Sequence, residues 1–278
     1  WYQRPLDTDS VFGITALFNN QNYLGVWLII CLPISIALIF DKSKNLLQRT
    51  FSFIISLMMA SGVVLTGSRN AILALFLIIP LLFINSINLS SLISIFFFLL
   101  FIIFLFLLSF LSLDFKLIFE SILSSEFFTN LNFTRYGQDN RFSIWRHTID
   151  LALQKPLFGW GPDIFSDLHN SKIEDIQHAH NLYLDLAFNY GLPCVFIIFG
   201  IIFLLLIKVL LNNLNLSKTK VSIKFASFIE KSWWVSCLIF SLTQLFDVQY
   251  YDGRISITFW LLLAGLKAQL NENKFIIK

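Results

Sequence analysis

The sequence predicts an all-α fold: a polytopic bundle of about seven transmembrane helices with a large, partly helical loop on the outer side of the membrane. The first observation is composition, because 56% of the 278 residues are hydrophobic and only 13% are charged. In a soluble domain, about a quarter of the residues are charged. The second is charge distribution, since long charge-free windows each hold one or two runs of the roughly 20 apolar residues that cross a bilayer. These windows lie between Asp9 and Asp41, Arg49 and Arg69, Arg69 and Asp114, and Asp185 and Lys208.

Polar breaks divide these windows into separate helices. The turn Gly67-Ser68-Arg69-Asn70 separates the second span from the third, and the polar segment 85–91 separates the third from the fourth. The last two spans are short and would depend on flanking Lys and Arg side chains that reach the interface. The expected spans are 22–40, 51–67, 71–86, 91–113, 191–211, 232–247 and 255–270, and residues 1–278 form a single membrane domain. Because the chain begins with Trp1, we expect a fragment whose N-terminal spans are missing, which makes seven spans a lower bound.

The distribution of Lys and Arg predicts the orientation of the bundle. Alternation of the spans places the loops 41–50 and 212–231 on the same side as the C-terminal tail. With their edges, these segments carry 11 of the 20 Lys and Arg but only 3 of the 17 acidic residues. Short loops rich in Lys and Arg face the cytoplasm. The N-terminal segment, the Arg69 turn and the loops 114–190 and 247–254 are therefore expected to face outward.

The outer loop 114–190 is too long for an ordinary connection, and loops of this length are usually functional or disordered. Its aromatic content and helical periodicity favour structure. We expect Asn140 to cap a helix that ends before Pro156, with Arg141 and Arg146 flanking its apolar face. Such a helix would lie on the membrane surface or over the bundle. Pro162 and Asp163, after the turn Gly159-Trp160-Gly161, are suited to begin another short helix. The predicted apolar face consists of Phe142, Trp145, Ile149 and Ala152 or Leu153.

A polar pair, His180-Asn181, stands where the next helix is expected to begin, and Gly191 suits the position after its end. A helix N-terminus disfavours a positive charge, so His180 should stay neutral there. A neutral imidazole at ambient pH is what a general base requires. The alternative is that His180 only caps the helix or holds the loop, and we favour the functional interpretation because arginines lie on the same outer side.

Arg69 is the second unusual residue, because it interrupts an apolar hairpin near the depth of the membrane. An arginine near hydrocarbon is costly and marks a functional site by default. A side chain that merely anchors the span boundary is an equally good explanation of Arg69 taken alone. Arg69, Arg141 and His180, however, all fall on the outer side by the charge argument, and two guanidinium groups can bind a diphosphate through paired hydrogen bonds.

Other types of site fit the sequence less well. His178 and His180 with Glu174 and Asp175 match no zinc spacing, and Cys31, Cys194 and Cys237 lie far apart in apolar runs. No phosphate-binding glycine loop and no serine nucleophile elbow is present. The lysines of the 212–231 loop fit a cytoplasmic anchor rather than a nucleic-acid surface. We therefore expect neither a metal nor a cofactor, and no nucleic-acid partner.

These motifs resemble those of the O-antigen ligase and O-antigen polymerase superfamily of bacterial envelope enzymes. The family pattern of His, then Asn, Ser or Gln, nine residues, Gly, two residues, and Gly, Thr or Tyr fits His180-Asn181 and Gly191, and fails only at Cys194. The Ser68-Arg69 turn resembles the family's Ser-Arg element. The stretch 141–145 with 156–161 resembles its outer-loop element, and 18–22 resembles the segment before an earlier span. The resemblance covers most of the chain and is most specific from about 60 to 195.

The resemblance implies an inverting, metal-independent membrane glycosyltransferase in the bacterial inner membrane. Its donor would be a polyprenyl-diphosphate-linked glycan, presented at the periplasmic face. His180 would be the general base, and Arg69 and Arg141 would bind the diphosphate and stabilise its developing charge. Asn181 and Arg146 are further candidates for substrate binding. The acceptor would be lipid A-core for a ligase, a growing glycan for a polymerase, or a protein hydroxyl for an oligosaccharyltransferase, and the His-Asn motif favours a ligase.

Two rival functions remain open at this point. The first is a transporter, since some members of this superfamily have been described as related to bicarbonate transport. A transporter should keep its ionisable residues near the middle of the bilayer, whereas this chain keeps them in its outer loops. The second is a non-catalytic scaffold of a polysaccharide export system, which predicts that Arg69, Arg141 and His180 tolerate substitution together.

Overall fold

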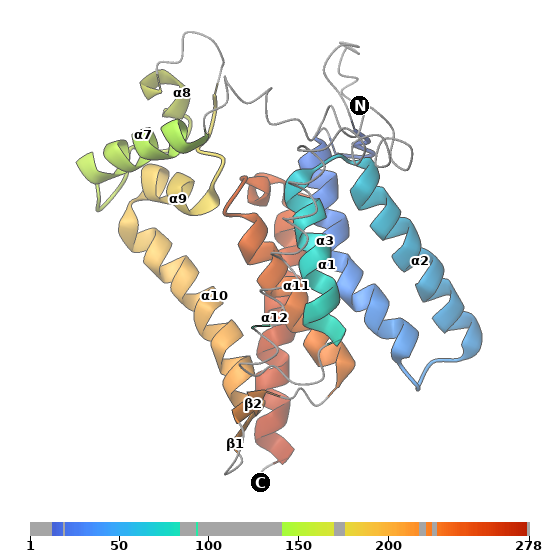
Figure 1. Ribbon diagram of the computed structural model, residues 1–278. Coiled ribbons are helices and arrows are strands. Elements are labelled where there is room, and N and C mark those ends of the chain that lie inside the picture. Colours follow the sequence, from blue (N-terminus) through green and yellow to red (C-terminus); the bar gives the residue numbers. More distant parts are fainter. Residues whose placement is uncertain are drawn as a thin grey trace.

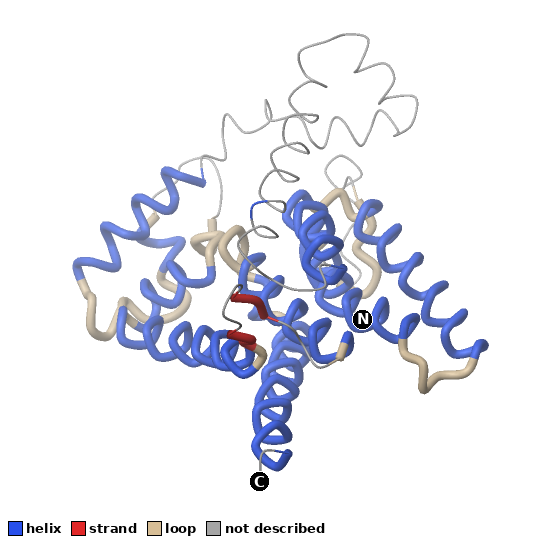
Figure 2. The backbone as a smooth tube through the Cα atoms, turned by 60° about the horizontal axis from the view of Figure 1, so that its bottom comes forward, coloured by secondary structure: helices blue, strands red, loops and turns tan. Residues whose placement is uncertain are grey.

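The computed structural model describes residues 13–18, 20–83, 93, 141–169, 176–216, 221–223 and 227–276. Helices account for most of this part of the chain (Figure 1). They are α1 (Gln21–Phe40), α2 (Leu46–Leu65), α3 (Arg69–Phe83), α7 (Arg141–Gln154), α8 (Phe165–Leu168), α9 (Leu182–Tyr190), α10 (Leu192–Asn212), α11 (Phe228–Thr243), a 3-10 turn (Gln249–Tyr251) and α12 (Gly253–Ile276). The predicted all-helical class is confirmed for these residues, apart from one small antiparallel ribbon of β1 (Leu214–Leu216) and β2 (Val221–Ile223), drawn in red in Figure 2.

Three of the described helices, α1, α2 and α10, are long and apolar enough to cross a membrane. They correspond to the expected spans 22–40, 51–67 and 191–211. Helix α3 is apolar but has only 15 residues, and α11 has 16 residues, which at 1.5 Å per residue is about 24 Å, short of a 30 Å hydrocarbon core. The expected span 91–113 lies outside the described residues, apart from residue 93. The protein is therefore a membrane protein, and the count of seven spans stays a prediction.

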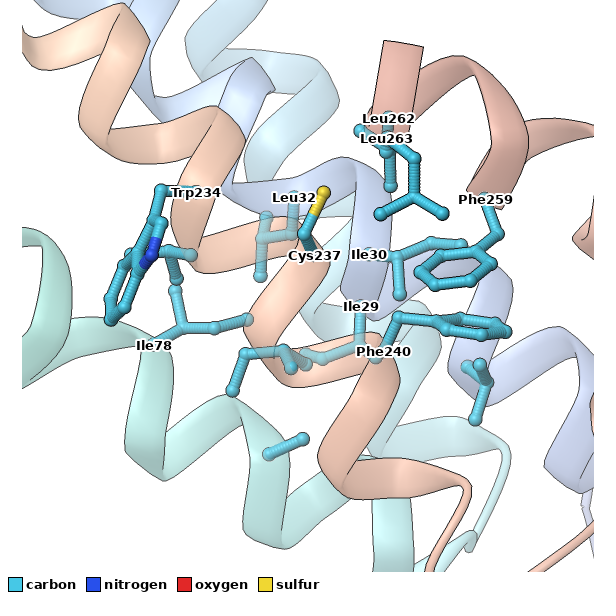
Figure 3. Close-up of a cluster of buried hydrophobic side chains, with 14 of the residues drawn as sticks. Ile29, Ile30, Leu32, Ile78, Trp234, Cys237, Phe240, Phe259, Leu262 and Leu263 are labelled. Carbon is cyan, nitrogen blue, oxygen red and sulfur yellow. The ribbon is translucent and has the colours of Figure 1, made fainter. Parts of the chain in front are cut away.

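The core lies where α1 packs against α3 and α11, and where α11 packs against α12. Ile29 and Ile30 of α1 are fully buried against Phe240 of α11 and Phe259 of α12 (Figure 3). The rings of Phe240 and Phe259 stack with centroids 4.0 Å apart. Helices α2 and α10 flank this core on opposite sides in Figure 1, and few of their apolar residues are fully buried. Exposed apolar faces of this kind are the surfaces that a bilayer would cover.

Helices α7, α8 and α9 form a separate layer at the end of the bundle where α10 begins (Figure 1). Helix α7 starts at Arg141 and ends at Gln154, before Pro156, as the sequence predicts. Asn140, its expected cap, lies outside the described residues. The short α8 begins at Phe165, slightly after the expected start at Pro162 and Asp163.

The side of α7 that packs on α9 differs from the apolar face that the sequence predicts. Phe142, Ile149 and Leu153 are exposed, and only Ala152 of that face is fully buried. The buried side of α7 instead carries Ile144 and Leu151, which pack in one cluster with Phe188 of α9. Helix α7 has apolar residues on both sides, and periodicity alone cannot tell which side α9 will cover. Phe142, Ile149 and Leu153 are therefore left uncovered by the described part of the protein.

The close approach of α1 to the turn before α3 predicts a difference between two helical glycines. A Cβ at Gly25 would lie 2.9 Å from the Cβ of Ala71 and 3.1 Å from that of Ser68, whereas a Cβ at Gly200 would meet nothing within 4 Å. We expect Gly25→Ala to lower the free energy of unfolding by about 1–3 kcal/mol through overpacking. Gly200→Ala, the matched control, should leave it unchanged or raise it, because Ala favours a helix. Thermal unfolding in detergent measures both, and equal melting temperatures would contradict the packing.

Candidate active site

The segment 243–248, between α11 and the 3-10 turn, is held by side chains from helices that are far away in the sequence. The Nδ2 of Asn70, in the first turn of α3, donates to the carbonyl of Thr243 at 2.8 Å. The Nδ2 of Asn181, the N-cap of α9, donates to the carbonyl of Leu245 at 3.0 Å. Arg141, the first residue of α7, donates to the carbonyl of Phe246. These bonds bring the N-terminal ends of three helices to one short stretch of backbone.

Asp247 lies at the centre of this segment and is only 4% exposed. Its Oδ2 accepts a hydrogen bond from Nδ2 of Asn22 in α1 at 3.1 Å, and its Oδ1 lies 3.3 Å from Nδ1 of His180. Burial raises the pKa of Asp247, but the hydrogen bond and charge of His180, together with the backbone N–H of Val248, bring that pKa below its usual value. Asp247 is therefore an ionised carboxylate at neutral pH.

The carboxylate determines which nitrogen of His180 carries a proton. An ionised carboxylate only accepts hydrogen bonds, so the Nδ1 that faces it carries the hydrogen. In a neutral imidazole, Nε2 then keeps a free lone pair. The neutral His180 predicted from the sequence depends only on the nearby helix N-terminus. The structure adds the neighbouring carboxylate of Asp247, and the neutrality of His180 stays a prediction.

His180 lies just outside α9, one residue before the cap. The side chain of Asn181 caps the helix by accepting from the backbone N–H groups of Tyr183 and Leu184. The helix ends at Tyr190, and Gly191 follows with φ of +85°, as the sequence predicts. His180 itself has φ of +49°, an uncommon conformation for a residue other than glycine. The imidazole is about one-third exposed and so remains accessible.

Arg69 and Arg141 lie at the same end of the bundle as the His180–Asp247 pair. Each is the first residue of its helix, α3 or α7, and their guanidinium groups are close enough for their charges to repel. The charge of Arg141 also acts on His178, whose ring centroid is 4.3 Å from that of His180. The three residues predicted as catalytic are thus brought together from segments that are far apart in the sequence.

The other two predicted substrate-binding residues, Asn181 and Arg146, differ from this group in their contacts or position. The side chain of Asn181 is occupied by the cap of α9 and by Leu245. Arg146 is exposed on α7, five residues after Arg141 and so roughly 140° around the helix from it. Within the described ranges, Arg146 has no hydrogen bond or ion pair to the cluster. Their roles in substrate binding stay predictions.

One group of side chains in the described residues has the composition of a metal site. Ligand atoms of His178, His180 and Asp247 all lie within 4.8 Å of one another. This set differs from the one that the sequence analysis set aside, because Asp247 takes the place of Glu174 and Asp175. The positive charge of Arg141, which reaches His178, opposes a cation here, whereas the carboxylate of Asp247 favours one.

Asp247 was not predicted as a site residue. A signal for it existed, because Asp247 is an acidic residue at the end of an apolar helix, on the side predicted for His180. Asn22 was present in the segment 18–22 that carries part of the family resemblance, but no role followed from it. Asp247 contacts Asn22 and His180, which are far away in the sequence, so both contacts depend on the tertiary structure.

Fold and site together define a helical membrane protein with a His–Asp pair and two arginines gathered at one end of its bundle. A sequence model of the O-antigen ligase family matches residues 53–199, just over half of the 278 residues. The chain therefore belongs to the O-antigen ligase family, which implies glycan transfer of the ligase or polymerase type on lipid-linked glycan substrates. A comparison with curated proteins finds no match. The matched range contains Arg69, Arg141 and His180, whereas Asp247 lies beyond it.

His178 gives a pH-dependent stability that can be measured. Burial, then the charge of His180, lowers its pKa from 6.5 to about 4. As pH falls, the unfolded chain therefore takes up this proton before the folded protein does, and stability is lost between about pH 6.5 and pH 4. The shift corresponds to at most about 3 kcal/mol. We expect His178→Asn, which does not titrate here, to reduce the fall in melting temperature between pH 7.5 and pH 5. An identical fall in both proteins would contradict this.

Proposed function

We propose that this protein transfers a glycan from a polyprenyl-diphosphate carrier to an acceptor hydroxyl at the periplasmic face of a bacterial inner membrane. The observation that carries the proposal is the His180–Asp247 pair beside Arg69 and Arg141. The loop 41–50, and the strands β1 and β2 of the segment 212–231, support this orientation, because they lie at the opposite end of the helices (Figure 1). The loop 114–190 is then periplasmic.

In the proposed reaction, His180 acts as the general base. Its Nε2 accepts the proton of the acceptor hydroxyl as the oxygen attacks the anomeric carbon of the first sugar. Asp247 holds Nδ1, fixes the tautomer and stabilises the imidazolium that forms. The bond between the anomeric carbon and the diphosphate oxygen breaks on the opposite face. One displacement of this kind inverts the configuration at the anomeric carbon.

Arg69 and Arg141 are proposed to bind the diphosphate of the donor. Two neighbouring guanidiniums repel each other until an anion lies between them. The leaving diphosphate gains negative charge, so fixed positive groups stabilise the transition state more than the ground state. Since the arginines supply this charge, the proposed mechanism needs neither a metal nor a nucleotide cofactor.

Among the three acceptors, we propose lipid A-core, which makes the protein a ligase. The support is the spacing from His180-Asn181 to Gly191, realised in the structure as the cap and the end of α9. Cys194 departs from the family pattern at its last position. A polymerase acting on a growing glycan and a transferase acting on a protein hydroxyl are the variants that an acceptor assay distinguishes.

The role of His180 is tested by His180→Ala in the full-length protein. Removal of a general base costs about a hundredfold to ten-thousandfold in rate, and we expect a loss of kcat in this range. Purified protein with lipid-linked glycan and lipid A-core provides the assay. His147→Ala is a matched control, since His147 also lies against a second histidine, His169, and bonds to the carbonyl of Leu168. Undiminished transfer by His180→Ala would overturn the role of the base.

The arginine pair is tested by charge-conserving changes. Arg69→Lys and Arg141→Lys keep the charge but lose the paired donors, so we expect each to lower kcat/KM by about tenfold or more. Lys44→Ala, at an exposed position in the opposite loop, is the control. Full activity of both lysine variants would exclude diphosphate binding by this pair. Solute flux through the protein without consumption of lipid-linked glycan would instead support a transporter.

A further inference from the structure

The turn His178-Ala179-His180 is held in an unusual shape by two side chains that the proposed chemistry does not use. His180 has φ of +49°, which a residue with a side chain keeps only when its surroundings enforce it. The backbone N–H of His180 donates to Nδ1 of His178 at 3.2 Å, and the backbone N–H of Ala179 donates to Oδ1 of Asp185 at 3.3 Å. The N–H groups of Ala179 and His180 thus each have a side-chain acceptor.

Asp185 connects the 178–180 turn to the 3-10 turn and to the end of α9. It is 1% exposed and lies in the first turn of α9. Its Oδ2 accepts from the hydroxyl of Tyr251 at 2.8 Å and from Nδ2 of Asn189 at 2.9 Å. Tyr251 belongs to the 3-10 turn that follows Asp247. The same carboxylate therefore ties the backbone before His180 to the segment that carries its partner, Asp247.

His178 acts on the turn as an Asn or Asp side chain does in an Asx-turn. Such a side chain accepts a hydrogen bond from the backbone N–H two residues later, which is the geometry of Nδ1 of His178 and N of His180. The two rings also meet edge to face, with an interplanar angle of 71°. His178 therefore supports both the backbone and the ring of His180.

We propose that Asp185 and His178 are positioning residues, which hold the 178–180 turn so that Nδ1 of His180 meets Asp247 and Nε2 is left for the acceptor. The proposal rests on the proposed function where it concerns kinetics, but its geometric part does not. Loss of either side chain frees the turn, so the His180–Asp247 contact is populated less. The rate of the chemical step falls, while the arginines continue to bind the donor.

The hydrogen-bond acceptor atoms of His178 and Asp185 can be removed or replaced one at a time, which allows a rescue experiment. His178→Asn keeps an oxygen acceptor for the N–H of His180, whereas His178→Ala removes it. Asp185→Asn keeps Oδ1 for Ala179, and Asn189 and Tyr251 can reorient toward its amide, whereas Asp185→Leu removes both oxygens. We expect the Ala and Leu variants to lose about tenfold or more in kcat with the KM for donor within about twofold of wild type. The Asn variants should recover most of that kcat.

Hydrogen exchange provides a readout that does not depend on activity. In full-length protein in lipid nanodiscs, the peptide that contains residues 177–181 should exchange faster in His178→Ala and Asp185→Leu, and at nearly the wild-type rate in the two Asn variants. His147→Ala and Asp150→Leu, at a histidine pair outside this turn and at an exposed position of α7, are the controls. If Asp185→Leu fails to insert, the His178 pair alone decides the question.

The outcomes separate this inference from the proposed function. A wild-type protein without transferase activity overturns the proposed function but leaves the exchange experiment valid. Unchanged exchange in both deletion variants overturns the positioning role, whatever the activity. Equal loss of kcat in His178→Asn and His178→Ala also overturns it, because a role of the acceptor atom predicts rescue by Asn. A rise in the KM for donor with unchanged kcat would place both residues in donor binding instead.

Discussion

The structure depends on how the polar groups of the segment 243–248 are satisfied between apolar helices. A buried carbonyl without a hydrogen bond would cost several kcal/mol. A buried carboxylate without a partner would take up a proton and lose its charge. Here the donors come from the first turns of four helices, through Asn22 of α1, Asn70 of α3, Arg141 of α7 and Asn181 at the cap of α9. One segment thus sets the mutual positions of the helix N-termini at this end of the bundle.

This arrangement explains why the arginines and the histidine meet at this point. The same helix ends that satisfy the segment carry Arg69, Arg141 and His180 at or next to their first residues. Helix N-termini favour negative charge, and the guanidinium groups add to that effect. Asp247 offsets part of this positive charge; burial raises its pKa, but the hydrogen bond and charge of His180 bring that pKa below its usual value. The proposed binding of the donor diphosphate beside His180 rests on this balance of charge.

Local chemistry made several elements predictable from the sequence. The apolar windows give α1, α2 and α10, and Gly191 ends α9 because only a residue without a side chain fits its φ and the nearby backbone of Leu157. The buried side of α7 was not predictable, because Ile144 and Phe142 both offer apolar surface. The role of Asp247 was also hidden, since its partner His180 is 67 residues away.

The sequence by itself determined that this is a helical membrane protein, and that Arg69, Arg141 and His180 are its candidate reactive residues. Hydrophobic run length and short motifs are local properties, and they do not require knowledge of neighbours in space. Tertiary structure alone decided that Asp247 faces His180, that Asn181 is used by a cap and a carbonyl, and that Asp185 holds the turn. No periodicity or motif in the sequence predicts these contacts, because they form only when the helices pack together.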